Sequence, residues 1–175
     1  SIRYARIYIN YRQSEAIATA LKDMDTVHHE IVVVDNSPDD TAQHEESARV
    51  LRSKAQYLAL DANKGFGTGA NRGARASTTP WLLFSNSDVH VTEAALDHMV
   101  SEVERRGLDA ACPETSDSRY SMPLPSWWWF LNTFTPFKRL GLSDKWKSDE
   151  PLTLWGGCLL IKRSVFETLG GFDER

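Results

Sequence analysis

The sequence contains few cysteines, no long apolar run and no excess of positive charge. Its two cysteines, Cys112 and Cys158, lack C-x-x-C spacing, which argues against a zinc site or redox motif and leaves one disulfide open. The longest unbroken apolar run, residues 127–131, is much shorter than the roughly 18 residues that a membrane-spanning helix needs. A net charge of −4 gives no overall attraction for nucleic acid. We therefore expect neither a membrane-spanning nor a nucleic-acid-binding protein.

Repeats, low-complexity segments and a leader-like N-terminus are also absent from the sequence. Because no basic start is followed by an apolar stretch and a small-residue cleavage site, we expect a reduced, cytoplasmic location. The 175 residues are 41% hydrophobic and 25% charged, which is typical of a globular chain with its own core. We expect a single domain that spans residues 1–175.

Strand-like and helix-like segments alternate along residues 6–106. The valines at residues 32–34 follow one another without polar alternation, which predicts a strand buried on both faces. The predicted strands lie at residues 6–10, 30–35, 55–60 and 81–85. A helix is predicted after each strand, the clearest at residues 92–106. Four such β-then-α units predict an α/β fold with a mostly parallel sheet flanked by helices.

Capping residues mark several of the predicted helix ends. Thr92 can cap the helix that follows it. A further strand is predicted at residues 154–162, and Ser164 with Glu167 has the spacing of a capping box at the start of a short helix. The glycine pair at residues 170–171 predicts the end of that helix.

Residues 114–151 interrupt this alternation and are rich in proline and tryptophan, which predicts an insertion rather than a second domain. Trp127, Trp128 and Trp129 in this insertion have two possible interpretations. Their rings pack the insertion onto the sheet, or they contact a lipid-linked acceptor or the inner face of a membrane.

Polar residues follow each of the predicted strands. In open parallel sheets, ligands bind beyond the carboxyl ends of the strands. A carboxylate there can accept hydrogen bonds from a nucleobase or ribose, and a second carboxylate can hold a divalent cation. For each acid alone, the alternative is a turn or a helix cap. The residues concerned are Asn10, Tyr11, Asp35, Asn36, residues 63–67 and residues 86–88.

The glycine-rich segment at residues 65–70 supports a competing hypothesis. Its G-x-G-x-x-A spacing follows a predicted strand, opens a helix and precedes Asp88 by about 20 residues, as in the NAD-binding domain of an oxidoreductase. Two features disfavour this hypothesis. Residues 61–64 separate the strand from the first glycine, and the segment lies in the third β-α unit, whereas the dinucleotide motif usually lies in the first.

Four segments carry a family resemblance when they are taken in order. They are residues 31–37 (IVVVDNS), residues 63–67 (NKGFG) with Asn71 and Gly73, residues 82–88 (LLFSNSD), and Gly156-Gly157 with residues 170–174 (GGFDE). Together they resemble the family 2 glycosyltransferases of GT-A fold, particularly the rhamnosyltransferase-like members. The resemblance implies a Rossmann-like GT-A sheet, a UDP- or dTDP-linked sugar donor, and inverting transfer of a hexose to a glycan or lipid-linked acceptor in polysaccharide biosynthesis.

The resemblance also implies roles for individual residues. Asp35 would recognise the nucleobase, and Asp88 would bind Mg²⁺ or Mn²⁺ on the diphosphate. The implied nucleotide-sugar-binding residues are Asn10, Tyr11, Asp35, Asn36, Asn63, Gly65, Gly67, Asn71, Asn86 and Asp88. The implied acceptor-side residues are Gly156, Gly157, Asp173 and Glu174.

The sequence departs from the family pattern at three positions. Asn10 and Arg12 stand where relatives carry threonine and asparagine in a Thr-Tyr-Asn-like turn, and Asn86 stands where many carry the first Asp of the metal-binding element. Asp88 would then share the metal with phosphate oxygens and water, which predicts weak metal binding without nucleotide. We expect His90, two residues further on, to make no catalytic contact.

No residue of the sequence is assigned as the catalytic base. Relatives place this carboxylate in a Glu-Asp pair beyond the Gly-Gly-Phe-Asp-Glu element, and the sequence stops at Arg175. We therefore expect a C-terminally truncated domain whose base lies beyond Arg175. The alternative is a domain that binds nucleotide without transferring sugar.

Overall fold

The computed structural model describes residues 3–22, 24, 29–37, 42–113, 154 and 156–175. The chain divides into two compact units, residues 1–113 with 156–175, and residues 114–155. Nearly all of the second unit, with the predicted insertion and Trp127 to Trp129, lies outside the described residues. The fold and site below therefore concern the first unit.

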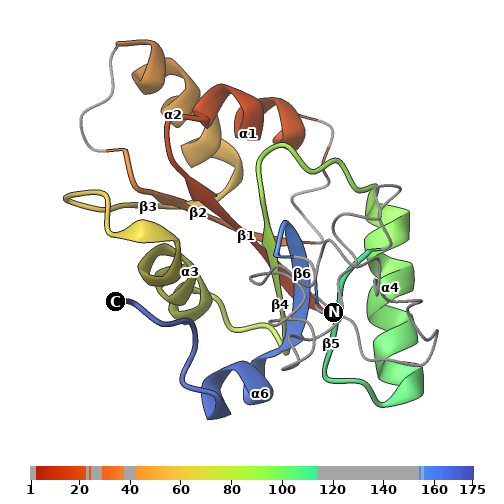
Figure 1. Cartoon of the computed structure of the whole chain (residues 1–175). Helices are drawn as coiled ribbons and strands as arrows, with labels where there is room; N and C mark the ends of the chain where they lie inside the picture. Colours follow the sequence, from red (N-terminus) through yellow and green to blue (C-terminus); the bar gives the residue numbers. More distant parts are fainter. Residues whose placement is uncertain (1–2, 23, 25–28, 38–41, 114–153, 155) are drawn as a thin grey trace, which may run out of the picture. The chain divides into compact units, whose positions relative to one another are not determined.

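The described residues form one six-stranded sheet with the strand order β3-β2-β1-β4-β6-β5 (Figure 1). Its strands are β1 (Tyr4–Asn10), β2 (Glu30–Asp35), β3 (Gln56–Ala59), β4 (Trp81–Ser85), β5 (Ala110–Ala111) and β6 (Cys158–Lys162). The first four are mutually parallel, which confirms the predicted mostly parallel α/β sheet. β6 runs antiparallel to β4, and β5 runs antiparallel to β6. Neither the direction of β6 nor the short strand β5 was predicted from the sequence.

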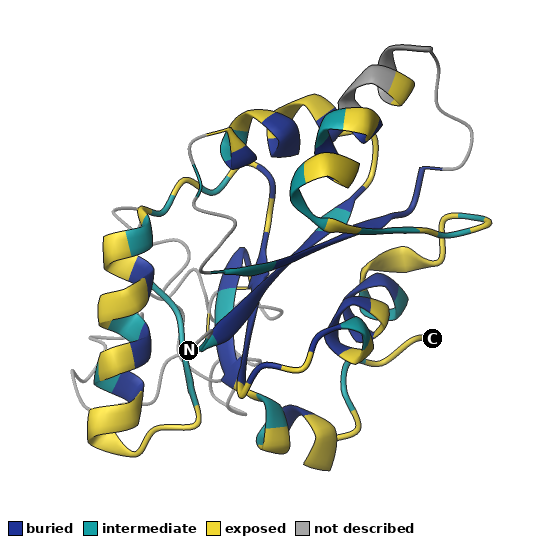
Figure 2. Cartoon of the chain, turned by 180° about the vertical axis from the view of Figure 1, so that it is seen from behind, coloured by how far each residue is buried: buried dark blue, intermediate teal, exposed yellow. Residues whose placement is uncertain are grey.

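Helices cover both faces of this sheet, and their buried sides face its strands (Figure 2). They are α1 (Ser14–Leu21), α2 (Ala42–Lys54), α3 (Gly65–Ala76), α4 (Glu93–Arg106) and α6 (Arg163–Thr168). Tyr8 and Val33 pack with residues of α1 and α2 in one apolar cluster, and Ile7 and Val34 pack with α3 and α6 in another. Since successive side chains of a strand point to opposite faces, β1 and β2 are buried on both sides of the sheet.

The helix ends follow the sequence signals in one case and depart from them in another. Thr92 caps α4, because its side chain accepts a hydrogen bond from the Ala95 amide at 3.3 Å. The predicted capping box at Ser164 is wrong, because α6 begins at Arg163 and its N-cap residue makes no side-chain capping bond. Glu167 instead forms an ion pair with Arg163 at 3.5 Å, one helical turn away.

Two further expectations concern the cysteines and the membrane. Cys112 and Cys158 are both free thiols, so the disulfide that the sequence left open is not formed. Burial raises the pKa of the Cys158 thiol to about 11, which keeps it protonated at neutral pH. In the described part of the chain, no helix is long and apolar enough to cross a membrane.

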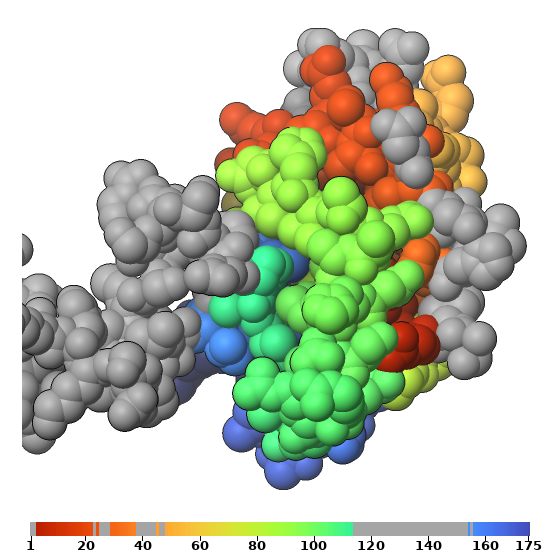
Figure 3. All heavy atoms as spheres, turned by 90° about the vertical axis from the view of Figure 1, so that its right-hand side faces the viewer, coloured from red at the N-terminus to blue at the C-terminus, as the bar shows by residue number. Residues whose placement is uncertain are grey.

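In the space-filling view, α4 forms much of one face, with β5 and β6 beside it (Figure 3).

The glycines of α3 allow the helix to approach the sheet and the C-terminal segment closely. A side chain at Gly73 would collide with the buried Ile7 of β1, and one at Gly69 would lie 2.9 Å from Ile9. A side chain at Gly67 would collide with the backbone of Asp173. Close packing therefore accounts for Gly67, Gly69 and Gly73, whereas a side chain at Gly65, the first glycine of the dinucleotide-like spacing, would meet nothing within 4 Å.

We predict that Gly73→Ala lowers the free energy of unfolding by about 1–3 kcal/mol, because the added methyl group overpacks the contact with Ile7. An alanine in an exposed helix would have the opposite effect. Urea unfolding checks this prediction, with Gly156→Ala as the control, since a side chain at Gly156 meets nothing within 4 Å. Equal stabilities of the two variants would contradict the packing explanation.

Candidate functional site

The strand order reverses beside β1, and we call the carboxyl edge of the sheet at this reversal the crevice, after the usual position of ligands in open α/β sheets. The chain builds β1, β2 and β3 outward in one direction and then returns to place β4 on the other side of β1 (Figure 1). Ligands of open α/β sheets bind at such a reversal, beyond the carboxyl ends of the strands. The loops after β1 and β4 meet there, because the hydroxyl of Ser87 hydrogen-bonds the side-chain oxygen of Gln13.

Asp35 is a buried carboxylate at the end of β2. Its Oδ1 accepts hydrogen bonds from the Asn10 side-chain amide at 3.1 Å and the Ser37 backbone amide at 2.9 Å. The Tyr57 hydroxyl of β3 donates to its Oδ2. Burial, and then this bond to Asp35, raises the pKa of Tyr57, so the phenol remains a hydrogen-bond donor. Three segments thus converge on one carboxylate.

Asn10 connects this carboxylate to the start of α1. Its amide nitrogen donates to the Ser14 hydroxyl at 2.8 Å as well as to Asp35, and its oxygen accepts from the Gln13 amide at 2.9 Å. The next residue, Tyr11, is 49% exposed at the carboxyl edge. The predicted nucleoside-pocket residues at the end of β1 and β2 are therefore brought together, with Asn10 buried behind an exposed aromatic ring.

Asn36 and Asn63 hold the glycine-rich loop at the start of α3. The Asn36 amide donates to the Gly65 carbonyl at 3.0 Å, and its oxygen accepts from the Lys64 amide at 3.3 Å. Asn63 accepts from the Gly65 amide at 3.0 Å. Gly65 has a φ of +80°, a conformation that glycine adopts without strain. Both asparagines thus fix the backbone of the loop beside Asp35.

Asn86 and Asp88 lie in the turn after β4, and both are exposed. The backbone amide of Asn86 donates to the Gly157 carbonyl at 2.9 Å. This bond continues the pairing of β4 with β6, in which Ser85 lies opposite Cys158. The predicted acceptor-side glycine pair therefore borders the predicted metal-binding turn. His90 is also exposed.

The donor atoms of this turn are compatible with Mg²⁺ or Mn²⁺. Asp88 offers a carboxylate and Asn86 an amide oxygen, the hard oxygen ligands that these cations prefer. Within the described residues, no group of three histidine, cysteine or acidic side chains could hold a metal. Asp88 and Asn86 alone therefore fit a cation that is held largely by phosphate oxygens and water.

Asn71 and the C-terminal segment form a second cluster of contacts. The Asn71 amide nitrogen donates to the Phe172 carbonyl at 2.9 Å and to the Glu174 carboxylate at 2.7 Å, while its oxygen accepts from the Phe172 amide at 2.9 Å. The Phe172 ring packs on Phe66 at 5.4 Å between centroids. Both polar atoms of the Asn71 side chain thus help to hold the Gly-Gly-Phe-Asp-Glu segment on α3.

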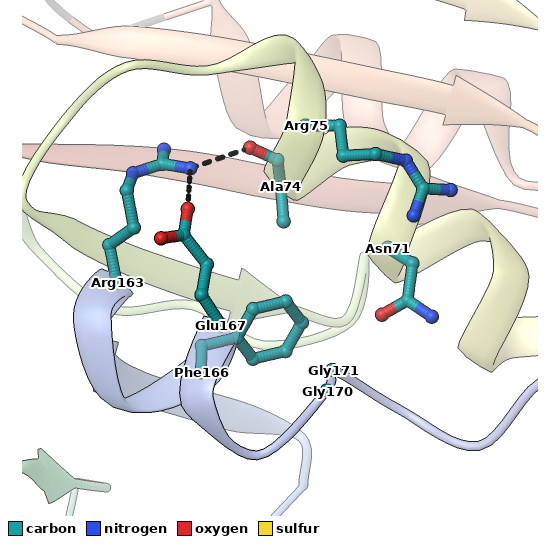
Figure 4. Close-up of a pocket in the computed structure, with 8 residues that line it drawn as sticks. All are labelled: Asn71, Ala74, Arg75, Arg163, Phe166, Glu167, Gly170 and Gly171. Carbon is teal, nitrogen blue, oxygen red and sulfur yellow. Dashed lines mark hydrogen bonds and ion pairs between the residues drawn. The ribbon is translucent and has the colours of Figure 1, made fainter.

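A pocket of about 200 Å³ lies between α3 and α6 (Figure 4). Arg163 on its wall donates to the Ala74 carbonyl at 2.9 Å and pairs with Glu167. Its lining residues are Asn71, Ala74, Arg75, Arg163, Phe166, Glu167, Gly170 and Gly171. None of them belongs to the loops after β1, β2 or β4. The pocket is therefore separate from the crevice at the carboxyl edge.

Three residues of the carboxyl-edge network were not identified from the sequence: Gln13, Ser37 and Tyr57. The sequence signal that could have identified Ser37 is its position directly after Asp35-Asn36, in a stretch rich in turn residues beyond a predicted strand. No local signal marks Tyr57, because it contacts Asp35 only through the pairing of β2 with β3.

The model of the glycosyl transferase family 2 matches residues 11–170. The chain belongs to glycosyltransferase family 2. This result confirms the family resemblance of the sequence and favours it over the dinucleotide-binding hypothesis.

Two curated relatives indicate which proteins this family 2 chain resembles. An N-acetylglucosaminyl-diphospho-decaprenol L-rhamnosyltransferase of Mycobacterium tuberculosis is 28% identical over 177 residues, which cover 83% of this chain and 55% of the relative. The O-antigen biosynthesis protein RfbC of Myxococcus xanthus is 29% identical over 120 residues, 60% of this chain and 9% of the relative. The chain thus spans about half of the first relative and a small part of the second.

Solved structures show the same fold as this family 2 chain. S. aureus TarS 1-349 gives a TM-score of 0.62 at 17% identity, covering 99% of this chain and 51% of that one. The mannosyltransferase PcManGT from Pyrobaculum calidifontis, in complex with GDP-Man and Mn²⁺, gives 0.66 at 16% identity, covering 98% and 48%. These similarities confirm the predicted GT-A fold.

We predict that Tyr57→Phe lowers the free energy of unfolding by about 1–2 kcal/mol, because Asp35 loses a hydrogen-bond donor while remaining buried. Tyr4→Phe is the matched control, since the buried Tyr4 hydroxyl has no hydrogen-bond partner in the described part of the chain. Chemical denaturation measures both variants. A loss of stability in Tyr4→Phe as large as that in Tyr57→Phe would contradict a specific role of the Asp35 contact.

We predict that Asn71→Asp lowers the free energy of unfolding by about 1–3 kcal/mol. A carboxylate cannot donate to the Phe172 carbonyl and repels Glu174. Asn63→Asp serves as the control, because the Asn63 side chain acts as an acceptor for the Gly65 amide and a carboxylate retains this function. Thermal unfolding of both variants tests the prediction, which fails if Asn71→Asp is as stable as the unmodified chain.

Proposed function

We propose that this family 2 chain binds a nucleotide-diphosphate sugar at the carboxyl edge of its sheet and takes part in the inverting transfer of a hexose to a glycan or lipid-linked acceptor. The observation that carries the proposal is the arrangement of two acids around the crevice. Asp35 is buried at the end of β2, and Asp88 is exposed beyond β4, with β1 between them.

Asp35 suits the recognition of a nucleobase that presents an N–H group. An ionised carboxylate is an acceptor only, and Tyr57, Asn10 and Ser37 fix its orientation. Uracil, thymine and guanine offer an imino N–H on the pairing edge, whereas adenine and cytosine do not. We favour a UDP- or dTDP-linked donor. Structures of TarS with UDP and UDP-GlcNAc support the first possibility by analogy.

Asp88, with the neighbouring Asn86, would hold Mg²⁺ or Mn²⁺ on the donor. Such a cation, when bound, neutralises charge that develops on the departing diphosphate. The Mn²⁺ in the mannosyltransferase structure supports this assignment by analogy. Because Asp88 is the only carboxylate that the described residues place in this turn, we expect the metal to bind tightly only together with the nucleotide.

The acceptor side would lie next to the metal-binding turn, at Gly156 and Gly157. Asp173 and Glu174 are poor candidates for the base. Arg175 hydrogen-bonds Asp173 and holds the pKa of its carboxyl below the usual value, which weakens it as a proton acceptor. Glu174 is engaged by Asn71. We propose that the base comes from outside the described residues and that these two acids contact the acceptor.

The experiment is a thermal-shift assay with UDP, dTDP, GDP and NADH, each with and without Mn²⁺. A ligand at a hundred times its dissociation constant adds about 2.7 kcal/mol, which raises the unfolding midpoint of a domain of this size by several degrees. We expect a metal-dependent shift with UDP or dTDP. Asp88→Asn should abolish the metal dependence.

Glu102→Gln is the control for this experiment, because it also removes one carboxylate but lies on α4 in an exposed pair with Arg105. The shift in this variant should equal that of the unmodified chain. A shift with NADH alone, or no shift with any nucleotide, would contradict the proposed function.

A further inference from the structure

Arg12 has a strained backbone at the centre of the carboxyl edge. It is the only residue other than glycine with a positive φ in the described part of the chain, at +56°. The left-handed region brings the Cβ of an L-residue close to its own carbonyl oxygen, so asparagine and glycine adopt it more easily than arginine does. An arginine at this position therefore needs an explanation other than backbone preference.

The hydrogen bonds around Asp35 impose this conformation. The Arg12 amide donates to the Ser37 hydroxyl at 2.6 Å, and the Ser37 amide donates to Asp35. On the other side, the Gln13 amide donates to Asn10. Any residue at position 12 would be held in the same left-handed turn. The Arg12 side chain is therefore not needed to form this turn.

Arg12 is exposed in the turn that follows β1. Its guanidinium group sits over the ring of the exposed Tyr11, 5.4 Å from the ring centroid. Among the described residues, no acid forms an ion pair with Arg12. The other cation of this edge, Lys64, pairs with Asp61 at 3.4 Å. Arg12 therefore presents a positive charge where the described chain supplies no counter-ion.

The strand order places Arg12 on the path of the nucleotide. β1 lies between β2 and β4 in the sheet, and Arg12 follows β1. A ligand whose base reaches Asp35 and whose diphosphate reaches Asp88 must cross the end of β1. The anionic part of the ligand would therefore pass close to the guanidinium group, which binds phosphate oxygens in a bidentate manner.

We infer that Arg12 is a phosphate-binding residue of the donor site, with the Tyr11 ring supporting its guanidinium group. The inference rests on the proposed function and adds to it a cation that does not depend on the metal. The strained turn at Arg12 lowers the stability of the fold. In return, it holds the positive charge where it strengthens binding of the nucleotide.

The test measures stability and affinity for three variants of the chain. Arg12→Gln removes the charge and keeps the backbone strain, Arg12→Asn removes the charge and relieves the strain, and Arg12→Lys keeps the charge. Calorimetric titrations with UDP and dTDP, and with uridine and thymidine as uncharged analogues, give the affinities. Thermal unfolding without ligand gives the stabilities.

We expect Arg12→Gln and Arg12→Asn to bind the nucleoside diphosphate about tenfold more weakly, as the loss of one charge-assisted contact predicts. Arg12→Lys should lose less, and the affinity for the nucleoside should not change. The unfolding midpoint should rise by about 1–3 °C in Arg12→Asn but not in Arg12→Gln. A purely structural role would not lower affinity while raising stability.

Three results would overturn the inference. Unchanged nucleotide affinity in both neutral variants would show that Arg12 does not bind the donor. An equal loss for nucleoside and nucleoside diphosphate would assign Arg12 to the base rather than to the phosphates. If the unmodified chain bound no nucleoside diphosphate, the proposed function would fail, and the inference with it.

Discussion

The buried carboxylate of Asp35 is the interaction on which the carboxyl edge depends. A buried charge is costly unless hydrogen bonds compensate for it. Here the compensation comes from the end of β1, the turn after β2 and the middle of β3. Meeting this requirement fixes three segments relative to one another before any ligand binds. The site is therefore preorganised by the same contacts that stabilise the sheet.

Close packing of α3 is the second constraint. Gly69 and Gly73 let the helix lie directly on β1, and Gly67 lets the C-terminal segment cross its first turn. Asn71 holds that segment through three hydrogen bonds. One helix thus joins the loop beside the proposed nucleotide site to the segment that we propose contacts the acceptor.

The charges of the crevice are distributed over separate strands. Asp35 follows β2, Arg12 follows β1 and Asp88 follows β4, so a ligand that spans the reversal of strand order can meet all three. In the proposed function, Asp35 accepts a hydrogen bond from the nucleobase, Arg12 binds phosphate and Asp88 binds the metal. This arrangement matches the parts of a nucleotide-diphosphate sugar.

Local patterns in the sequence were sufficient to predict several elements of this protein. The bounds of β2 and β4, the cap at Thr92 and the positions of acids beyond strands follow from apolar periodicity and turn chemistry. Tertiary structure alone decided the antiparallel course of β6, the bond of Tyr57 to Asp35, and the contact between Asn71 and Phe172, which are 101 residues apart. Local periodicity specifies which face of an element is apolar, but it does not specify which distant backbone will lie against that face. The packing function of the glycines and the left-handed turn at Arg12 became visible only with those neighbours in place.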